Sequence, residues 1–226
     1  MGGANLPGPS NALGQLDDYG WVGTNDLNQF SIGFPTFARN YNRVTLPEGK
    51  DLATEHTMET STERLWKYSA DKRKITTWAG KSKFQAWPFK DDASEKGSKA
   101  TISYEFWDGF KDFGVQWNYD AASNSYARTM AGQPHVDLNN NKQIMSKNVV
   151  VLFTTEKGPI NENKHMLYGT TGTGKATIFM DGQAVEATWS KATRVAPLKF
   201  QVRGKEIELN RGQTWISVVA TGTTVT

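Results

Sequence analysis

The residues best suited to chemistry lie in one short segment, between Tyr126 and Asp137. Arg128 belongs to an alternating run that predicts a strand. His135 and Asp137 are two residues apart, so on a strand their side chains share a face. A carboxylate beside an imidazole can orient a general base, or both can ligate a metal. The alternative is a polar turn after Pro134, in which Asp137 accepts hydrogen bonds from backbone amides. One histidine and one aspartate do not complete a metal set, so we predict no metal site.

Aromatic and histidine side chains supply the binding candidates, namely His56, Trp78, Trp87 and Tyr126. The chain holds 8 tryptophans, and an exposed indole can stack on a sugar ring, as a wall-glycan binder requires. Tryptophan in an alternating run more often belongs to the core. Trp78 and Trp87 lie in a polar, poorly periodic stretch, which favours exposure. His56 could converge on the site of Arg128, although its place near a helix start is also explained by local capping electrostatics.

The segment from Gly169 to Lys175 matches the glycine-rich loop that cradles phosphates, up to its last position. There Ala176 stands where a hydroxyl should ligate Mg²⁺. A phosphate loop must also run into a helix, whereas residues 175–180 alternate and are β-branched, which predicts a strand ending in the Asp181-Gly182 turn. We therefore predict no nucleotide and no other cofactor.

Composition excludes several classes of protein. The chain has 226 residues, no cysteine and a net charge of only +3, so disulfides and thiolate chemistry are absent and nucleic-acid binding is not expected. No apolar run has the length of a membrane helix. We expect contact with a membrane only through an anchor that this chain does not carry.

Hydrophobic alternation predicts an α+β fold, with a β-rich antiparallel C-terminal half and a few helices in the N-terminal third. Strands are expected from Ile102 onward, and the continuous apolar run from Val149 to Phe153 predicts the centre of a sheet. Helices are expected over residues 11–18 and after a capping box formed by Thr60 and Glu63. We predict a partial α+β domain over residues 1–145 and a β-rich domain over residues 146–226.

Many short motifs in one order carry a family resemblance; they lie at residues 55–61, 115–120, 126–137, 148–151, 172–189 and 212–216. In these motifs the chain resembles the YerB-like lipoproteins, a bacterial family whose domains have no known function. The resemblance implies an extracytoplasmic, cell-envelope-associated binding or scaffold domain without demonstrated chemistry. Its partner would be an envelope glycan or an envelope protein. The alternative is an enzyme acting on an envelope polymer through Arg128, His135 and Asp137.

Two departures from the family bear on the N-terminal region. Members resemble secreted lipoproteins with a signal peptide and a lipidated cysteine, and they carry a further segment ahead of the position where this chain begins. If the first domain has lost a neighbouring strand, a free edge and apolar residues such as Phe30 and Phe34 are uncovered. We therefore predict self-association, or dependence on a partner segment, through residues 20–50.

Overall fold

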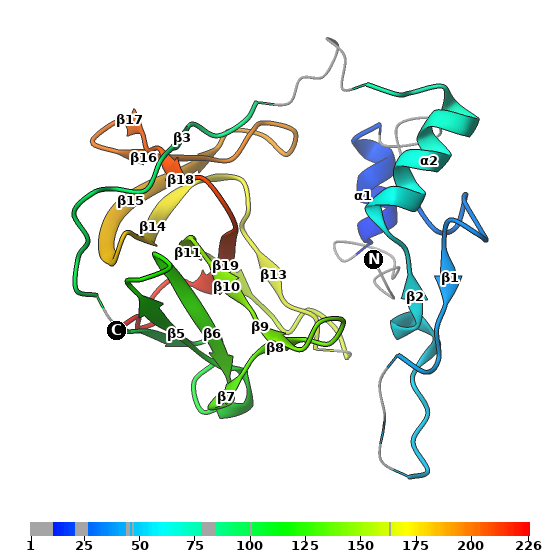
Figure 1. Cartoon of the computed structure of the whole chain (residues 1–226), viewed down its shortest axis with the longest axis horizontal. Coiled ribbons are helices and arrows are strands. Elements are labelled where there is room, and N and C mark those ends of the chain that lie inside the picture. The colour runs from blue at the N-terminus through cyan, green and yellow to red at the C-terminus, as the bar shows by residue number, and fades with distance from the viewer. Residues whose placement is uncertain are drawn as a thin grey trace. The chain divides into compact units, whose positions relative to one another are not determined.

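The structure is a computed structural model that describes residues 11–20, 27–43, 46, 48–77, 85–99, 101–162 and 164–226. The chain divides into two compact units, residues 1–83 and 84–226. The boundary expected between residues 145 and 146 thus falls inside the second unit. The described chain is β-rich and contains two α-helices (Figure 1).

The first unit holds both α-helices, α1 (Ala12–Asp18) and α2 (Thr62–Arg73). The cap of α2 is Ser61, whose hydroxyl accepts a hydrogen bond from the Arg64 amide at 3.2 Å. The N-cap is therefore one residue later than expected and no capping box forms, since Arg64 takes the position that would need Glu or Gln; the Thr60 hydroxyl donates to the Thr36 carbonyl instead. This unit also contains a two-stranded ladder of β1 (Ala38–Arg39) and β2 (Met58–Glu59), and the 3-10 turn η2 (Thr54–His56).

A six-stranded sheet forms the centre of the second unit, in the order β17-β16-β15-β14-β11-β19. Its strands are β11 (Asn148–Thr154), β14 (Gly172–Met180), β15 (Gln183–Lys191), β16 (Lys199–Val202), β17 (Lys205–Glu206) and β19 (Thr214–Ala220). The apolar run of β11 lies between β14 and β19, as its composition predicts. The β11–β19 pair is parallel, so the expectation of an antiparallel half was wrong at this edge.

A tight turn joins β14 to β15. Asp181 and Gly182 both have positive φ, 53° and 66°, which suits the right-handed twist of a two-residue hairpin and confirms the expected turn. Near the other end of the hairpin, a Cβ on Gly174 would lie 2.5 Å from the Trp189 indole nitrogen. Glycine at this position lets the indole cross the strand and donate to the Phe153 carbonyl at 2.8 Å.

A five-stranded sheet in the order β10-β6-β5-β4, with β7 paired to β6, faces the central sheet. Its strands are β4 (Thr101–Glu105), β5 (Gly114–Asp120), β6 (Ser125–Met130), β7 (Gln133–Pro134) and β10 (Met145–Ser146), and the 3-10 turn η3 (Lys111–Phe113) precedes β5. Both sheets contribute to one core, in which Ile102, Trp117 and Tyr126 meet Val149 and Val151. The two sheets therefore form a sandwich.

A second core covers the other face of the central sheet, where Val150, Ile178 and Phe200 pack with Trp87 and Leu209. Short ladders complete the unit: β3 (Phe89–Lys90) with β18 (Leu209–Asn210), β8 (Val136–Asp137) with β9 (Lys142–Gln143), and β12 (Glu156–Lys157) with β13 (Leu167–Tyr168). Burial on both faces explains why β11 is apolar from Val149 to Phe153.

Candidate functional site

Arg128 and His135 meet inside the sandwich. Antiparallel pairing brings β7 and the residue after it back to β6, and the His135 amide donates to the Arg128 carbonyl at 3.0 Å. The guanidinium of Arg128 also hydrogen-bonds to Nδ1 of the His135 ring. Because a guanidinium can only donate, this Nδ1 must be the unprotonated acceptor. The structure thus brings together two of the three residues expected to do chemistry.

The Arg128 cation lies between aromatic rings. It is 3% exposed, with its guanidinium carbon 4.7 Å from the Trp215 ring centroid and 5.7 Å from that of Trp117. Burial, and then the charge of Arg128, lower the pKa of His135. A neighbouring cation therefore weakens the basicity of His135, the opposite of what a general base needs.

Asp137 satisfies its carboxylate within its own hairpin. Its Oδ1 accepts from the Asn139 amide at 2.8 Å and from Asn139 Nδ2 at 3.0 Å. This is the polar turn that sequence analysis gave as the alternative. These hydrogen bonds engage Asp137 in the β8–β9 turn. Arg128 and His135 are therefore in contact without a carboxylate that orients the histidine. Nor do the described residues hold a cluster of three or more His, Asp or Glu side chains suited to a metal ion.

The predicted binding residues occupy different environments. Tyr126 is fully buried and its hydroxyl accepts from the Gly182 amide at 3.1 Å, so its expected binding role is corrected to a core role. Trp87 is half-buried, with its indole donating to the Leu198 carbonyl at 2.6 Å. Its remaining surface lines a groove of about 360 Å³. His56 is exposed in η2 of the first unit, and Trp78 lies outside the described residues.

The glycine-rich segment resembling a phosphate loop runs directly into β14, in which Lys175 pairs with Thr188 across the β14–β15 hairpin. A strand has no cluster of free amides pointing along its axis, so the anion-holding helix start is missing. The expected strand after this segment is confirmed.

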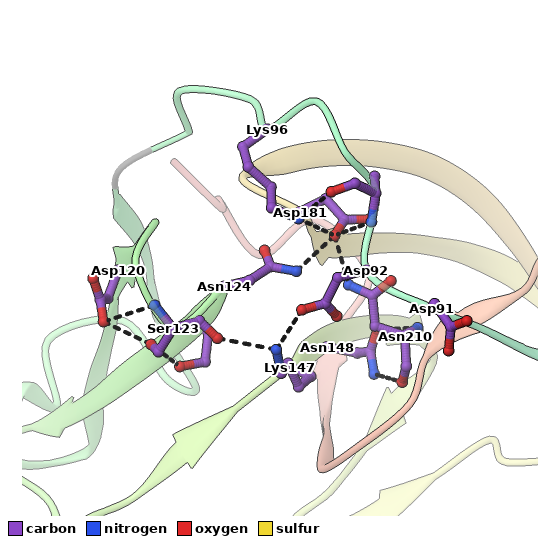
Figure 2. A network of polar contacts seen from close by, with 12 residues as sticks. Asp91, Asp92, Lys96, Asp120, Ser123, Asn124, Lys147, Asn148, Asp181 and Asn210 are labelled. Carbon is purple, nitrogen blue, oxygen red and sulfur yellow. Dashed lines mark hydrogen bonds and ion pairs between the residues drawn. The ribbon is translucent and has the colours of Figure 1, made fainter.

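The densest polar cluster surrounds Asp181 (Figure 2). Its carboxylate accepts hydrogen bonds from Lys90 Nζ at 2.7 Å and from the side-chain amides of Asn124 and Asn210, each at 2.8 Å. The Ala93 amide adds a contact at 3.2 Å. Burial alone would raise the pKa of Asp181, but the hydrogen bonds, led by that from Lys90, lower it to about 2.

This cluster ties distant segments together. Lys90 comes from β3, Asn124 from the β5–β6 turn and Asn210 from β18, and all of them converge on the turn between β14 and β15. Around it, Lys147 pairs with Asp92 at 2.6 Å (Figure 2). Since the Asp181 oxygens are already occupied by protein donors, the cluster is structural.

An open groove of about 850 Å³ lies beside the five-stranded sheet, next to exposed aromatic residues. Trp107 lines it and is 38% exposed; Phe110 and Phe113, at 59% and 43%, contact Trp107 with centroids 6.4 and 5.6 Å away. The two phenylalanine rings stand nearly perpendicular to the Trp107 ring, at 76° and 85°, so Trp107 with these edge-to-face neighbours forms an aromatic platform beside the groove. The loop between β4 and β5 presents them, because β4 ends at Glu105.

Polar side chains line the same groove. Glu156 of β12 lies opposite Tyr168 of β13, and its buried Oε2 has no hydrogen-bond partner in the described part of the chain. Burial, and then the nearby Glu156 carboxylate, raise the pKa of Tyr168 to about 12. Glu105 and Gln116 also line the groove. The arrangement can stack a flat apolar surface and hydrogen-bond to polar groups around it.

Sequence reasoning missed this groove. Alternation assigns most tryptophans to the core, and no such pattern in the sequence singles out Trp107 or Glu156. The available signal was the run Phe106-Trp107-Asp108-Gly109-Phe110, in which aromatic residues occupy a turn rather than a strand. A turn lies on the surface, so its aromatic residues have no core to enter.

Comparisons with known proteins agree with this fold. The family model of the "Protein of unknown function (DUF3048) C-terminal domain" matches residues 102–216. The chain therefore belongs to the DUF3048 C-terminal domain family.

Among individual proteins, the chain is similar to YerB of Bacillus subtilis (strain 168), a predicted lipoprotein, at 26% identity over 106 residues. That match covers 46% of this chain and 31% of YerB, so the match spans about a third of the relative. The crystal structure of YerB from Bacillus subtilis has a TM-score of 0.71 at 17% identity, covering 97% of this chain and 68% of that one. The resemblance to YerB-like proteins is thus confirmed, and the structural likeness shows a shared fold.

Among the described residues, no helix is long and apolar enough to cross a membrane.

Proposed function

We propose that this chain is an extracytoplasmic, cell-envelope-associated binding or scaffold domain of a bacterial lipoprotein-like protein, and that it binds an envelope glycan. The observation that carries the proposal is the aromatic platform of Trp107 beside a groove lined with carboxylates and amides. A sugar ring has one apolar face and a rim of hydroxyls, so it needs a flat aromatic surface and hydrogen-bonding groups around it. Trp107 supplies the first, and Glu105, Gln116 and Glu156 supply the second.

The envelope location rests on the relative YerB, a predicted lipoprotein. A lipid anchor holds a domain at the outer face of a membrane, where glycan polymers are the abundant ligand.

Binding is favoured over chemistry because the candidate catalytic residues do not form a working set. The cation of Arg128 faces the imidazole of His135, and Asp137 is engaged by Asn139. Without an orienting carboxylate, the histidine cannot act as the base of a dyad. Hydrolysis of an envelope polymer through these residues is therefore the less favoured alternative.

The test is isothermal titration calorimetry with soluble wall-glycan oligosaccharides. Trp107→Ala removes the central stacking surface, and losing such an aromatic contact costs about 2 kcal/mol or more, or roughly a 30-fold weaker Kd. Trp66→Ala is the matched control, because Trp66 is 52% exposed on α2 of the first unit. We expect binding that Trp107→Ala weakens and Trp66→Ala leaves unchanged. Equal affinity in all three proteins would contradict the proposal.

A further inference from the structure

A strap formed by residues 221–226 spans the space between the two sheets at one end of the sandwich. It follows β19, and the Thr221 amide donates to the Thr154 carbonyl of β11 at 2.7 Å. At its far end, Thr226 and Ser103 of β4 exchange both backbone hydrogen bonds, at 2.9 and 3.1 Å. The strap is therefore held by one strand from each sheet.

The groove beside Trp107 lies against this strap, and a second groove of about 790 Å³ shares two of its residues, Gly222 and Thr223. Each groove has the volume of a small-molecule site, about 300–1,000 Å³. Because they share the strap as a wall, a long ligand lying across the strap would enter both.

The second groove has a different lining from the first. Exposed threonines at positions 155, 171 and 221 bring hydroxyls to it, and a hydroxyl can both donate and accept. Lys175 projects from β14 into the same lining and is exposed. In the described part of the chain Lys175 has no carboxylate within ion-pair distance, so its charge is available to an acidic group.

We infer that the two grooves form one extended site for a linear glycan bearing acidic substituents. One sugar stacks on Trp107, the chain crosses the hydroxyl-rich strap, and a carboxylate on a later sugar lies near Lys175. This inference rests on the proposed function and adds the ligand's length and charge.

The glycine-rich segment that resembles a phosphate loop gains a role in this arrangement. Thr171 and Lys175 both lie in it and line the second groove, where they would meet hydroxyls and a carboxylate instead of a nucleotide. Gly172, with φ 105°, lets the chain turn from this segment into β14.

The experiment compares a disaccharide with an octasaccharide of alternating N-acetylglucosamine and N-acetylmuramic acid, whose lactyl groups carry carboxylates. For the wild-type chain we expect the octasaccharide to bind at least about tenfold more tightly, since it engages both grooves. Lys175→Ala and, independently, Thr171→Glu, which places a negative charge in the groove that holds Lys175, should reduce this gain and leave the disaccharide affinity unchanged. Lys142→Ala is the control, because Lys142 is likewise an exposed strand lysine and lines neither groove.

The outcomes separate the two proposals. Equal affinity for both lengths, or a length effect that both second-groove variants leave intact, would overturn the extended site while the proposed function stood. A failure of both oligosaccharides to bind would overturn the proposed function, and the extended site with it. Thermal unfolding of each variant shows whether a lost gain in octasaccharide affinity comes from the altered groove or from a destabilised fold.

Discussion

Replacing Asp181 by asparagine tests the polar cluster that joins the segments of the second unit. Asp181 is 4% exposed and its carboxylate accepts hydrogen bonds from Lys90, Asn124 and Asn210. Asparagine tolerates the left-handed conformation that Asp181 adopts at φ 53°, so the variant keeps the turn and removes the charge. Every hydrogen-bond partner of Asp181 donates to its carboxylate. The side-chain amide of asparagine would place another donor against these donors.

The expected loss of stability follows from the pKa of Asp181. Lowering it from 3.8 to about 2 corresponds to about 2.5 kcal/mol, because a tenfold change in proton affinity is worth about 1.4 kcal/mol. A mismatched buried donor adds about 1 kcal/mol or more. We therefore expect Asp181→Asn to lower the free energy of unfolding by about 3–5 kcal/mol, in the range for a broken buried ion pair.

Urea unfolding at neutral pH, followed by tryptophan fluorescence, measures the change. Asp91→Asn is the control, because Asp91 pairs with Arg211 at 3.0 Å while its side chain is 92% exposed; it should unfold like wild type. The loss should persist above pH 4 and shrink toward pH 2, since a carboxyl with a depressed pKa contributes only while it is ionised. An Asp181→Asn midpoint equal to that of wild type would refute the reasoning.

Three other predictions concern His135, Lys175 and the first unit. Because burial and Arg128 lower the pKa of His135, its protonation opposes folding; stability should fall as pH drops below about 6.5, and His135→Gln should remove that part of the pH dependence. Mg-ATP should not shift the melting temperature, and a shift abolished by Lys175→Ala would contradict the assignment of Gly172–Met180 as a strand without a phosphate site. Phe30 and Phe34, at 69% and 86% exposed, should drive self-association in light scattering; a monomer whose behaviour Phe34→Ser leaves unchanged would end that idea.

The hydrophobic pattern predicted the strands that carry the strongest apolar signal. The alternation around Trp117 and the apolar run of β11 placed those strands in the core, where both are buried. The Asp181-Gly182 turn was predictable because few residue pairs accept positive φ at both positions.

Pairing between distant strands was not predictable, because alternation carries no information on which strand is the neighbour. The parallel union of β11 with β19 and the docking of β3 on β18 depend on the whole sheet. The same limit applied to the candidate site. Spacing predicted that His135 and Asp137 share a face, but the neighbouring Asn139 donates a hydrogen bond to the Asp137 carboxylate. The groove beside Trp107 is formed by strands remote in sequence, so no single motif marks it.

The central claim, that Trp107 and its groove receive a glycan, is tested most directly by nitrogen-15 NMR of the indole groups. The chain has 8 tryptophans, and each gives one indole N–H signal. Titration with wall-glycan oligosaccharide should shift the signal of Trp107 in a saturable manner and leave that of exposed Trp66 in place. A saturable shift of other indoles with Trp107 unmoved, or no shift at all, would contradict the account.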